Sequence, residues 1–200
     1  MDYLNIDNIN AVESGPICIK NFLTLLCQKD ARIRDIFKSN NKKLKEDLKN
    51  LRENLEIDKY ISAVEFARRI KEYGFMSEMI ILDSNDISKH KELFPLFACL
   101  KNDYNETVFL YICDINDKGI IVKDMNYNDM LIDYASFEKF FIRRMIAIKD
   151  YSEFIKKYCD NKMLKEFANK KYNCNVDVSD GLECVGGVVL GILNVLLDIY

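Results

Sequence analysis

The residues that could most clearly take part in a reaction lie near the amino end, where a polar segment precedes Ser14-Gly15-Pro16. Apolar residues then follow with helical spacing at Ile17, Phe22, Leu25 and Leu26. Ser14 is a favourable helix N-cap, and Pro16 falls near the first helical position, where its missing N–H is harmless. We therefore predict a helix that begins at Ser14. A side chain at such a start faces unpaired N–H groups and the positive end of the helix dipole, where proteins activate nucleophiles and stabilise oxyanions.

Other side chains that could act as nucleophile, base or metal ligand are few. The chain has one histidine, His90, in a charged loop, and seven cysteines without a CxxC pair. This spacing does not match a zinc site, so we expect neither a metal nor another cofactor. Among the cysteines Cys18 is the best placed, one helical turn after Ser14. Free cysteines are commonly buried, so we interpret Cys18, Cys99 and Cys113 as core residues.

Composition limits the class of protein. Two hundred residues, of which 49% are hydrophobic, suit one domain, or one domain with a tail, that has a real core. The net charge of −3 arises from interspersed charges of both signs, which argues against a nucleic-acid partner. The first residues are polar and lack the basic region of a signal peptide. Together with the free thiols, this predicts a cytoplasmic protein.

The order of predicted elements is helices first and strands second, which favours an α+β fold with an antiparallel sheet. Ser62 and Glu65 form a capping box for a helix that ends at Gly74. The apolar run 107–113 is typical of a central strand, and residues 116–119 form a hairpin turn before a returning strand, 120–124. Further elements are predicted as strands at 76–82, 96–101 and 145–148 and a short helix at 136–141.

A charged stretch, 29–59, carries leucines with a spacing of three and four residues, at Leu44, Leu48, Leu51 and Leu55. This narrow apolar stripe predicts a helix at the surface that covers one edge of the core. An alternative is an adaptor helix for a partner protein.

The carboxyl-terminal part is predicted as a helical extension. Residues 151–172 have the pattern of an amphipathic helix, and 184–197 form a run of fourteen residues without a charge. That run is shorter than the roughly 20 residues a membrane helix needs. We interpret it as a packed or interfacial helix, so membrane contact through the 185–197 tail stays open, as does the start of a transmembrane span. The predicted domains are 1–150, with the charged insert, and 151–200.

Six segments in order resemble the papain-like peptidase domain at the amino terminus of bacterial ABC exporters that process bacteriocins and similar peptides. The opening Asn8 to Cys18 is similar to that family's Gln-x-x-Ala-Val-Glu-Cys-Gly-x-x-Cys/Ser motif. The match spans roughly residues 5–149. The other five segments are residues 62–74 (Ser-Ala…Tyr-Gly), 93–101 (Leu-Pro-x-Ile-Ala), 108–111 (His-Phe-Val-Val), 122–124 (Val-x-Asp-Pro) and 134–140 (Leu-Ser-x-x-Glu-Phe).

The resemblance implies a papain-like fold and cleavage after a double-glycine leader by a Cys–His–Asp triad with a glutamine in the oxyanion hole. Carried over position by position, the nucleophile falls on Ser14 and the general base on Val108. The orienting carboxylate falls on Asp124 and the oxyanion donor on Asn8. Three of these four residues depart from the family's pattern, and only Asp124 matches it.

These departures predict a site without catalysis. A serine hydroxyl depends on a base even more than a thiol does, and Val108 accepts no proton. Asp124 is a weak base at neutral pH and is better interpreted as a turn former before Asn126 and Asn128. His90 lies eighteen residues before the base position and is interpreted as an exposed loop residue. An engineered inactivation would need one substitution, so Val108 argues against it.

The resemblance therefore predicts a peptidase-like domain without catalytic groups, whose partner is a leader-bearing or substrate peptide. Its setting would be a peptide-exporting ABC transporter, with a membrane or ATPase subunit as a further partner at the inner face of the bacterial cell membrane. Gly186-Gly187 is weakly similar to a double-glycine leader, although a helix start explains it better. Two alternatives stay open: a residual leader peptidase that uses another base, and a non-catalytic interaction, immunity or assembly protein.

Overall fold

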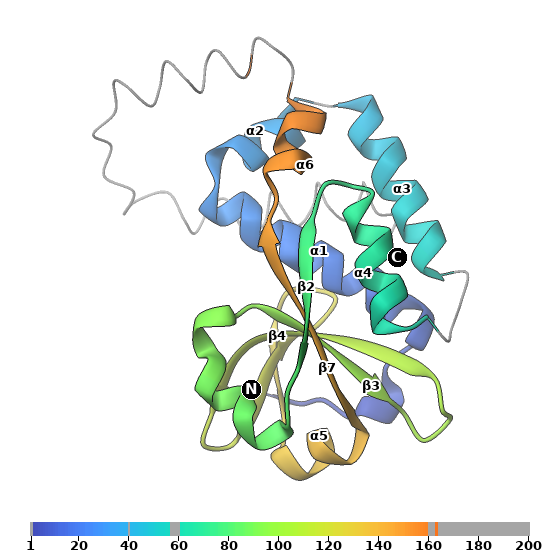
Figure 1. The fold of residues 1–200 in the computed structure, drawn as a ribbon, viewed down its shortest axis with the longest axis vertical. Helices are drawn as coiled ribbons and strands as arrows, with labels where there is room; N and C mark the ends of the chain where they lie inside the picture. The colour runs from blue at the N-terminus through green and yellow to red at the C-terminus, as the bar shows by residue number, and fades with distance from the viewer. Residues whose placement is uncertain (1, 40, 57–60, 160–162, 164–200) are drawn as a thin grey trace.

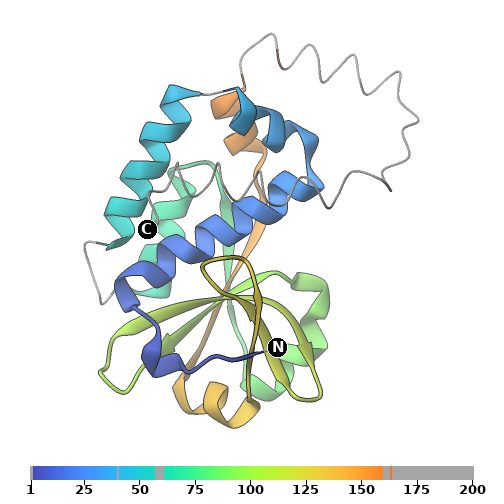
Figure 2. The same cartoon turned by 180° about the vertical axis from the view of Figure 1, so that it is seen from behind.

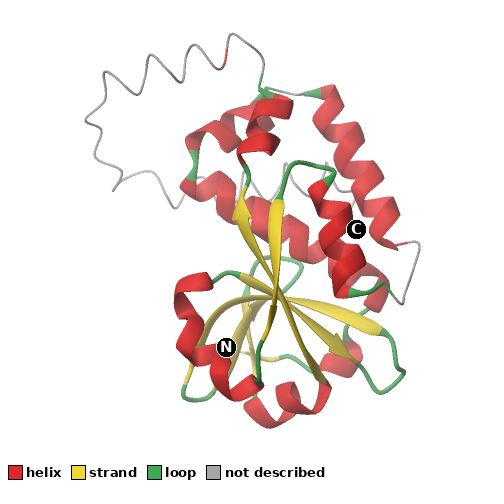
Figure 3. Ribbon diagram, in the orientation of Figure 1, coloured by secondary structure: helices red, strands yellow, loops and turns green. Residues whose placement is uncertain are grey.

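The computed structural model describes residues 2–39, 41–56, 61–159 and 163 and has two layers, one of helices and one of sheet (Figure 1). The helices α1, α2, α3, α4 and α6 gather on one face of the sheet. A short helix, α5, lies at the far side (Figure 3). This mixed arrangement confirms the predicted α+β class.

The sheet has seven strands in the order β1-β6-β5-β4-β3-β7-β2, which places β4 in the middle. All neighbours are antiparallel except β1 and β6, which pair in parallel. The run 107–113 is therefore a central strand, as its apolar sequence predicts. The strands are β1 (Asp2–Tyr3), β2 (Met76–Ile81), β3 (Leu96–Lys101), β4 (Thr107–Asn116), β5 (Gly119–Lys123), β6 (Asp129–Ile132) and β7 (Phe141–Asp150).

The helical layer is built around α1, which runs across the sheet between β4 and the other helices (Figure 2). Its apolar residues pack together with those of α2, α3, α4 and α6, and the four leucines of the stripe on α3 are buried. This confirms a helix that covers the core. The helices are α1 (Ala11–Lys29), α2 (Ala31–Lys38), α3 (Lys42–Glu56), α4 (Ala63–Lys71), α5 (Tyr134–Phe140) and α6 (Ser152–Tyr158), with 3-10 helices η1 (Ile6–Asn8) and η2 (Ser84–Leu93).

The predicted start of the first helix is wrong. Asn10 is the N-cap, because its side chain accepts a hydrogen bond from the Val12 N–H, and the helix begins at Ala11. Asparagine and serine cap helices about equally well, so the sequence alone does not choose between them. Ser14 thus lies in the first turn. Pro16 lies inside the helix, where it leaves the Val12 carbonyl without its usual donor.

Two apolar clusters fill the space on the two faces of the sheet. The cluster on the helical face contains a chain of touching aromatic rings, in which Phe66 stacks on Phe109 with a centroid separation of 4.4 Å and Phe75 stacks on Phe154 at 4.8 Å. The cluster on the other face joins β3, β4, β5 and β7 to α5 and η2. Alternate residues of β4 enter opposite clusters, so Phe109 faces the helices and Val108 faces away.

Several predicted elements differ from the structure in extent. The last strand is longer than 145–148, the segment before Ile132 forms the extra strand β6, and the charged stretch contains a separate helix, α2. The described part of the helix predicted over 151–172 forms α6, with Cys159 as its C-cap, and residues 160–162 and 164–172 lie outside the described residues. The apolar tail 184–197 and Gly186-Gly187 lie outside the described residues. The domain boundary at 150 stays a prediction, although Phe154, Ile155 and Tyr158 of α6 are buried in the helical cluster.

Within the residues that the structure describes, no helix combines the length and the apolar character needed to cross a membrane.

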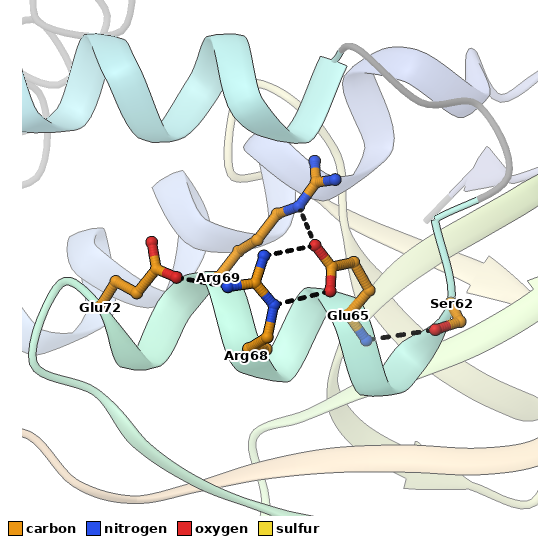
Figure 4. A network of polar contacts seen from close by, with 5 residues as sticks. All are labelled: Ser62, Glu65, Arg68, Arg69 and Glu72. Carbon is orange, nitrogen blue, oxygen red and sulfur yellow. Dashed lines mark hydrogen bonds and ion pairs between the residues drawn. The ribbon is translucent and has the colours of Figure 1, made fainter.

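An ionic network runs along α4 and fixes its first two turns (Figure 4). Of the predicted capping box one half is observed, in which Ser62 caps the helix by accepting a hydrogen bond from the Glu65 N–H. The Glu65 carboxylate turns to the guanidinium groups of Arg68 and Arg69 at 2.7–2.8 Å, and Arg68 also contacts Glu72. Hydrogen bonds from Arg68 and Arg69 lower the pKa of Glu65 to about 2.

The low pKa of Glu65 predicts a pH-dependent contribution to stability. A carboxylate with a lowered pKa in the folded state stabilises the protein above its unfolded pKa, and this effect is lost as pH falls through the folded pKa. Glu65→Gln should therefore lower the urea midpoint by a constant amount at pH 5–7, and the difference from wild type should shrink between pH 4.5 and about 2. Glu46→Gln, on an exposed position of α3, is the control. A difference that stays unchanged down to pH 2 would contradict the prediction.

Gly74 is required where α4 turns into β2. Its φ of +96° favours glycine, and its carbonyl accepts a hydrogen bond from the Phe154 N–H. An added Cβ would lie 2.7 Å from the Phe154 Cα and would overlap its backbone nitrogen. We expect Gly74→Ala to lower the free energy of unfolding by about 3 kcal/mol, since strain and overlap act together. Chemical unfolding measures this loss, and Lys71→Ala, three residues earlier on an exposed position, should have little effect.

Candidate functional site

The hydroxyl of Ser14 lies between the first helix and the central strand and is bonded on both sides. Its oxygen donates to the Ala11 carbonyl at 2.9 Å and accepts from the Phe109 N–H at 3.0 Å. The residue is 2% exposed. The hydroxyl proton is thus held by a carbonyl of its own helix, and the oxygen ties α1 to β4.

The position expected for the general base lies next to this contact, but its side chain is apolar and buried. Val108 is 0% exposed and packs in the cluster on the face of the sheet away from the helical layer. The neighbouring Phe109 faces the helices and supplies the backbone N–H that Ser14 accepts. The structure therefore brings Ser14 beside the expected strand position without a proton acceptor on that strand residue.

The carboxylate of Asp124 shapes a turn. It accepts hydrogen bonds from the backbone N–H groups of Asn126 and Asn128 at 2.8 and 2.7 Å and from the Asn128 side chain at 3.1 Å. This agrees with its interpretation as a turn former. The turn contacts α1 at Lys20 and Asn21, six and seven residues after Ser14, which corresponds to roughly 9–10 Å along the helix axis.

Sequence reasoning missed two buried polar residues of α1 that hold this turn. The Lys20 ammonium donates to the Met125 carbonyl, and the Asn21 amide donates to the carbonyls of Lys123 and Asp124 at 3.2 and 3.0 Å. Lys20 is 1% exposed, and burial lowers its pKa while the nearby Asp124 opposes that shift. The sequence did contain a signal for them. A lysine and an asparagine stand between apolar residues on a helix that carries too few charged residues to be exposed to solvent.

The remaining candidates are placed as follows. Asn8 lies in η1 and is exposed. The His90 ring contacts Glu92 at 3.3 Å, and its side chain is 39% exposed. Cys18 and Cys99 are buried in the helical cluster, and burial raises the pKa of both thiols, that of Cys99 to about 12. Cys113 is half-buried. No group of histidine, cysteine and acidic residues among the described positions could hold a metal ion.

These positions favour a structural function for Ser14. Nucleophilic attack requires a base that removes the hydroxyl proton, and here the proton is donated to a main-chain carbonyl. The carboxylate of Asp124 is engaged by three N–H groups of its own turn. The assignment of ancestral catalytic positions to Ser14, Val108, Asp124 and Asn8 stays a prediction from the resemblance.

Comparison with known proteins gives limited information. No protein-family model and no curated protein sequence matches the chain. Among solved structures, a weak likeness is found to a double glycine motif protease from an AMS/PCAT transporter, determined in complex with the leader peptide. The TM-score is 0.37 and the identity 17%, over 48% of this chain and 69% of that chain.

The double hydrogen bond of Ser14 predicts a loss of stability in Ser14→Ala. The substitution leaves the buried Phe109 N–H without an acceptor, which costs about 1–3 kcal/mol. Thr24→Val is the matched control, because the Thr24 hydroxyl is equally buried in α1 but bonds only the Lys20 carbonyl of its own helix. We expect the control to lose less than about 1 kcal/mol in urea unfolding, since no N–H group loses its acceptor. Equal losses in both variants would contradict a specific link between α1 and β4.

Proposed function

We propose that this protein binds a peptide, such as a leader-bearing substrate of an ABC exporter, and does not cleave it. The proposal that the peptide is not cleaved is supported by the Ser14 hydroxyl, which is hydrogen-bonded to both the Ala11 carbonyl and the Phe109 N–H. A nucleophile in this position would first have to break both bonds in a buried environment and would then find valine where a base is needed. The proposal that a peptide is bound rests on the resemblance over residues 5–149.

An edge of the sheet offers a surface for such a peptide. Strand β2 lies at one end of the sheet, and an edge strand leaves a row of N–H and C=O groups without a neighbouring strand. It also carries three exposed apolar side chains, Met76, Met79 and Ile81, which are 58%, 39% and 73% exposed. Extended peptides bind such edges through main-chain hydrogen bonds, and alternate side chains supply specificity. Met79 and Ile81 share one face of the strand and would contact alternate apolar residues of the peptide.

The proposed setting is the inner face of a bacterial membrane, with the membrane or ATPase subunit of an exporter as a further partner. The alternative of a residual leader peptidase is disfavoured by the bonded Ser14 hydroxyl. The alternative of an interaction, immunity or assembly protein differs in its ligand, which would be a folded protein. The buried leucine stripe on α3 is used in the core and offers that alternative no support.

A paired assay tests the proposal with one set of samples. A fluorescent double-glycine leader peptide is mixed with the full chain, binding is followed by anisotropy, and cleavage is followed by mass spectrometry. We expect saturable binding and an intact peptide. Ile81→Glu should weaken binding about tenfold, because it removes an apolar contact of about 1.4 kcal/mol and places a charge beside the edge.

The control for the edge is Tyr3→Glu, which places the same charge on the exposed strand β1 at the opposite end of the sheet. Its affinity should equal that of the wild type. Cleavage of the peptide would overturn the argument from Ser14 and Val108. If the chain neither bound nor cut the peptide, the result would favour the partner-protein alternative.

A further inference from the structure

A pocket of about 380 Å³ opens at the carboxyl end of α1, far from Ser14. Its wall from α1 is formed by residues 25–29, which lie roughly 16–22 Å from Ser14 along the helix axis. Strands β4 and β5 and the turn held by Asp124 form the opposite walls. The volume falls in the range of pockets that bind small organic ligands.

The walls combine aromatic and aliphatic side chains with a few polar groups. Lys123 and Asp129 form an ion pair at 2.8 Å, and the Lys123 ammonium lies 4.4 Å from the centre of the Tyr127 ring. Three of the four charged residues that line the pocket are already in ion pairs, since Lys123 pairs with Asp129 and Asp114 lies 3.8 Å from Lys91 outside the lining. An uncharged ligand therefore suits the pocket better than an ion. The apolar contacts would come from Leu25, Phe94, Pro95, Tyr111, Ile121 and Tyr127.

The hydroxyl of Tyr111 is the observation that indicates a ligand. Tyr111 is 1% exposed, and within the described part of the chain its buried hydroxyl has no hydrogen-bond partner. Buried hydroxyl groups are nearly always bonded, so an unbonded one beside a cavity marks a place for an acceptor. Its surroundings agree with this placement, because burial and the neighbouring pocket residues Tyr127 and Cys113 raise the pKa of Tyr111 and keep the hydroxyl protonated.

We propose that this pocket binds a small uncharged molecule with one ring and one hydrogen-bond acceptor, and that the Tyr111 hydroxyl donates to that acceptor. The ring would lie among the aromatic and aliphatic walls, which gives the affinity. The acceptor would pair the hydroxyl, which gives the orientation. This site is separate from peptide binding at β2 and goes beyond that proposed function.

The test uses two probes of nearly the same shape. Acetophenone carries a carbonyl oxygen, and α-methylstyrene carries a methylene group in its place. Both are titrated into the full chain and followed by amide chemical shifts. We expect saturable shifts around Tyr111, Cys113 and Tyr127, with acetophenone bound about tenfold more tightly, as one buried hydrogen bond provides. Failure of both probes to saturate, or equal affinities, would overturn the proposal.

Three variants locate the binding site of the probes. Tyr111→Phe should weaken acetophenone binding about tenfold and leave α-methylstyrene binding unchanged, whereas Tyr104→Phe, at an exposed tyrosine, should change neither. Gln28→Trp should fill the pocket and remove the binding of both probes. Without probe, Tyr111→Phe should keep the melting temperature or raise it, because it removes a hydroxyl without a partner. A marked drop would mean that the hydroxyl is already bonded, and would overturn the proposal.

Discussion

The burial of α1 is the constraint on which the rest of the structure depends. This helix lies between the sheet and the other helices, so polar side chains on it enter the interior together with the apolar ones. A buried polar group is costly unless it is hydrogen-bonded. Ser14 and Lys20 meet this requirement by reaching main-chain groups of β4 and of the turn after β5. The Asn21 amide N–H groups likewise donate to β5 and to this turn, although the Asn21 side-chain oxygen has no partner among the described residues. The same bonds therefore satisfy the helix and fix where the strands lie.

This constraint also decides what chemistry the helix start can perform. A nucleophile must be reachable by substrate and must share its proton with a base. Ser14 is instead 2% exposed and shares its proton with the Ala11 carbonyl. The hydrogen bond from the Phe109 N–H places Ser14 beside the strand that begins at Thr107. The activity that the resemblance implies needs a proton acceptor at the position of Val108, and Val108 is an apolar residue of the core.

The sequence predicted the elements whose signals are local. The apolar run of β4, the turn before β5, the Ser62 cap and the leucines of α3 each specify their own structure through burial, turn chemistry or capping. It did not predict β1, because this strand of two residues is defined by pairing with β6, more than a hundred residues away in the chain. It did not predict β6 either, because the polar residues before it are typical of a loop. The sequence did not distinguish Asn10 from Ser14 as the N-cap of α1, because asparagine and serine are about equally favourable at that position. The pocket was invisible for a related reason, since its walls come from four separate segments.

Two buried hydroxyl groups at β4, those of Ser14 and Tyr111, differ in their hydrogen bonding. That of Ser14 makes two hydrogen bonds at the amino end of α1, so nothing remains there for a ligand to supply. That of Tyr111, three residues along the strand from Val108, makes none among the described residues, and Tyr111 is one of the residues that line a cavity at the other end of the helix. Since an unbonded buried hydroxyl gains most from a new partner, ligand recognition on this helical face belongs to the Tyr111 end of α1. Ser14 thus contributes to the packing of α1 on β4, whereas the pocket lies roughly 16–22 Å further along the helix axis.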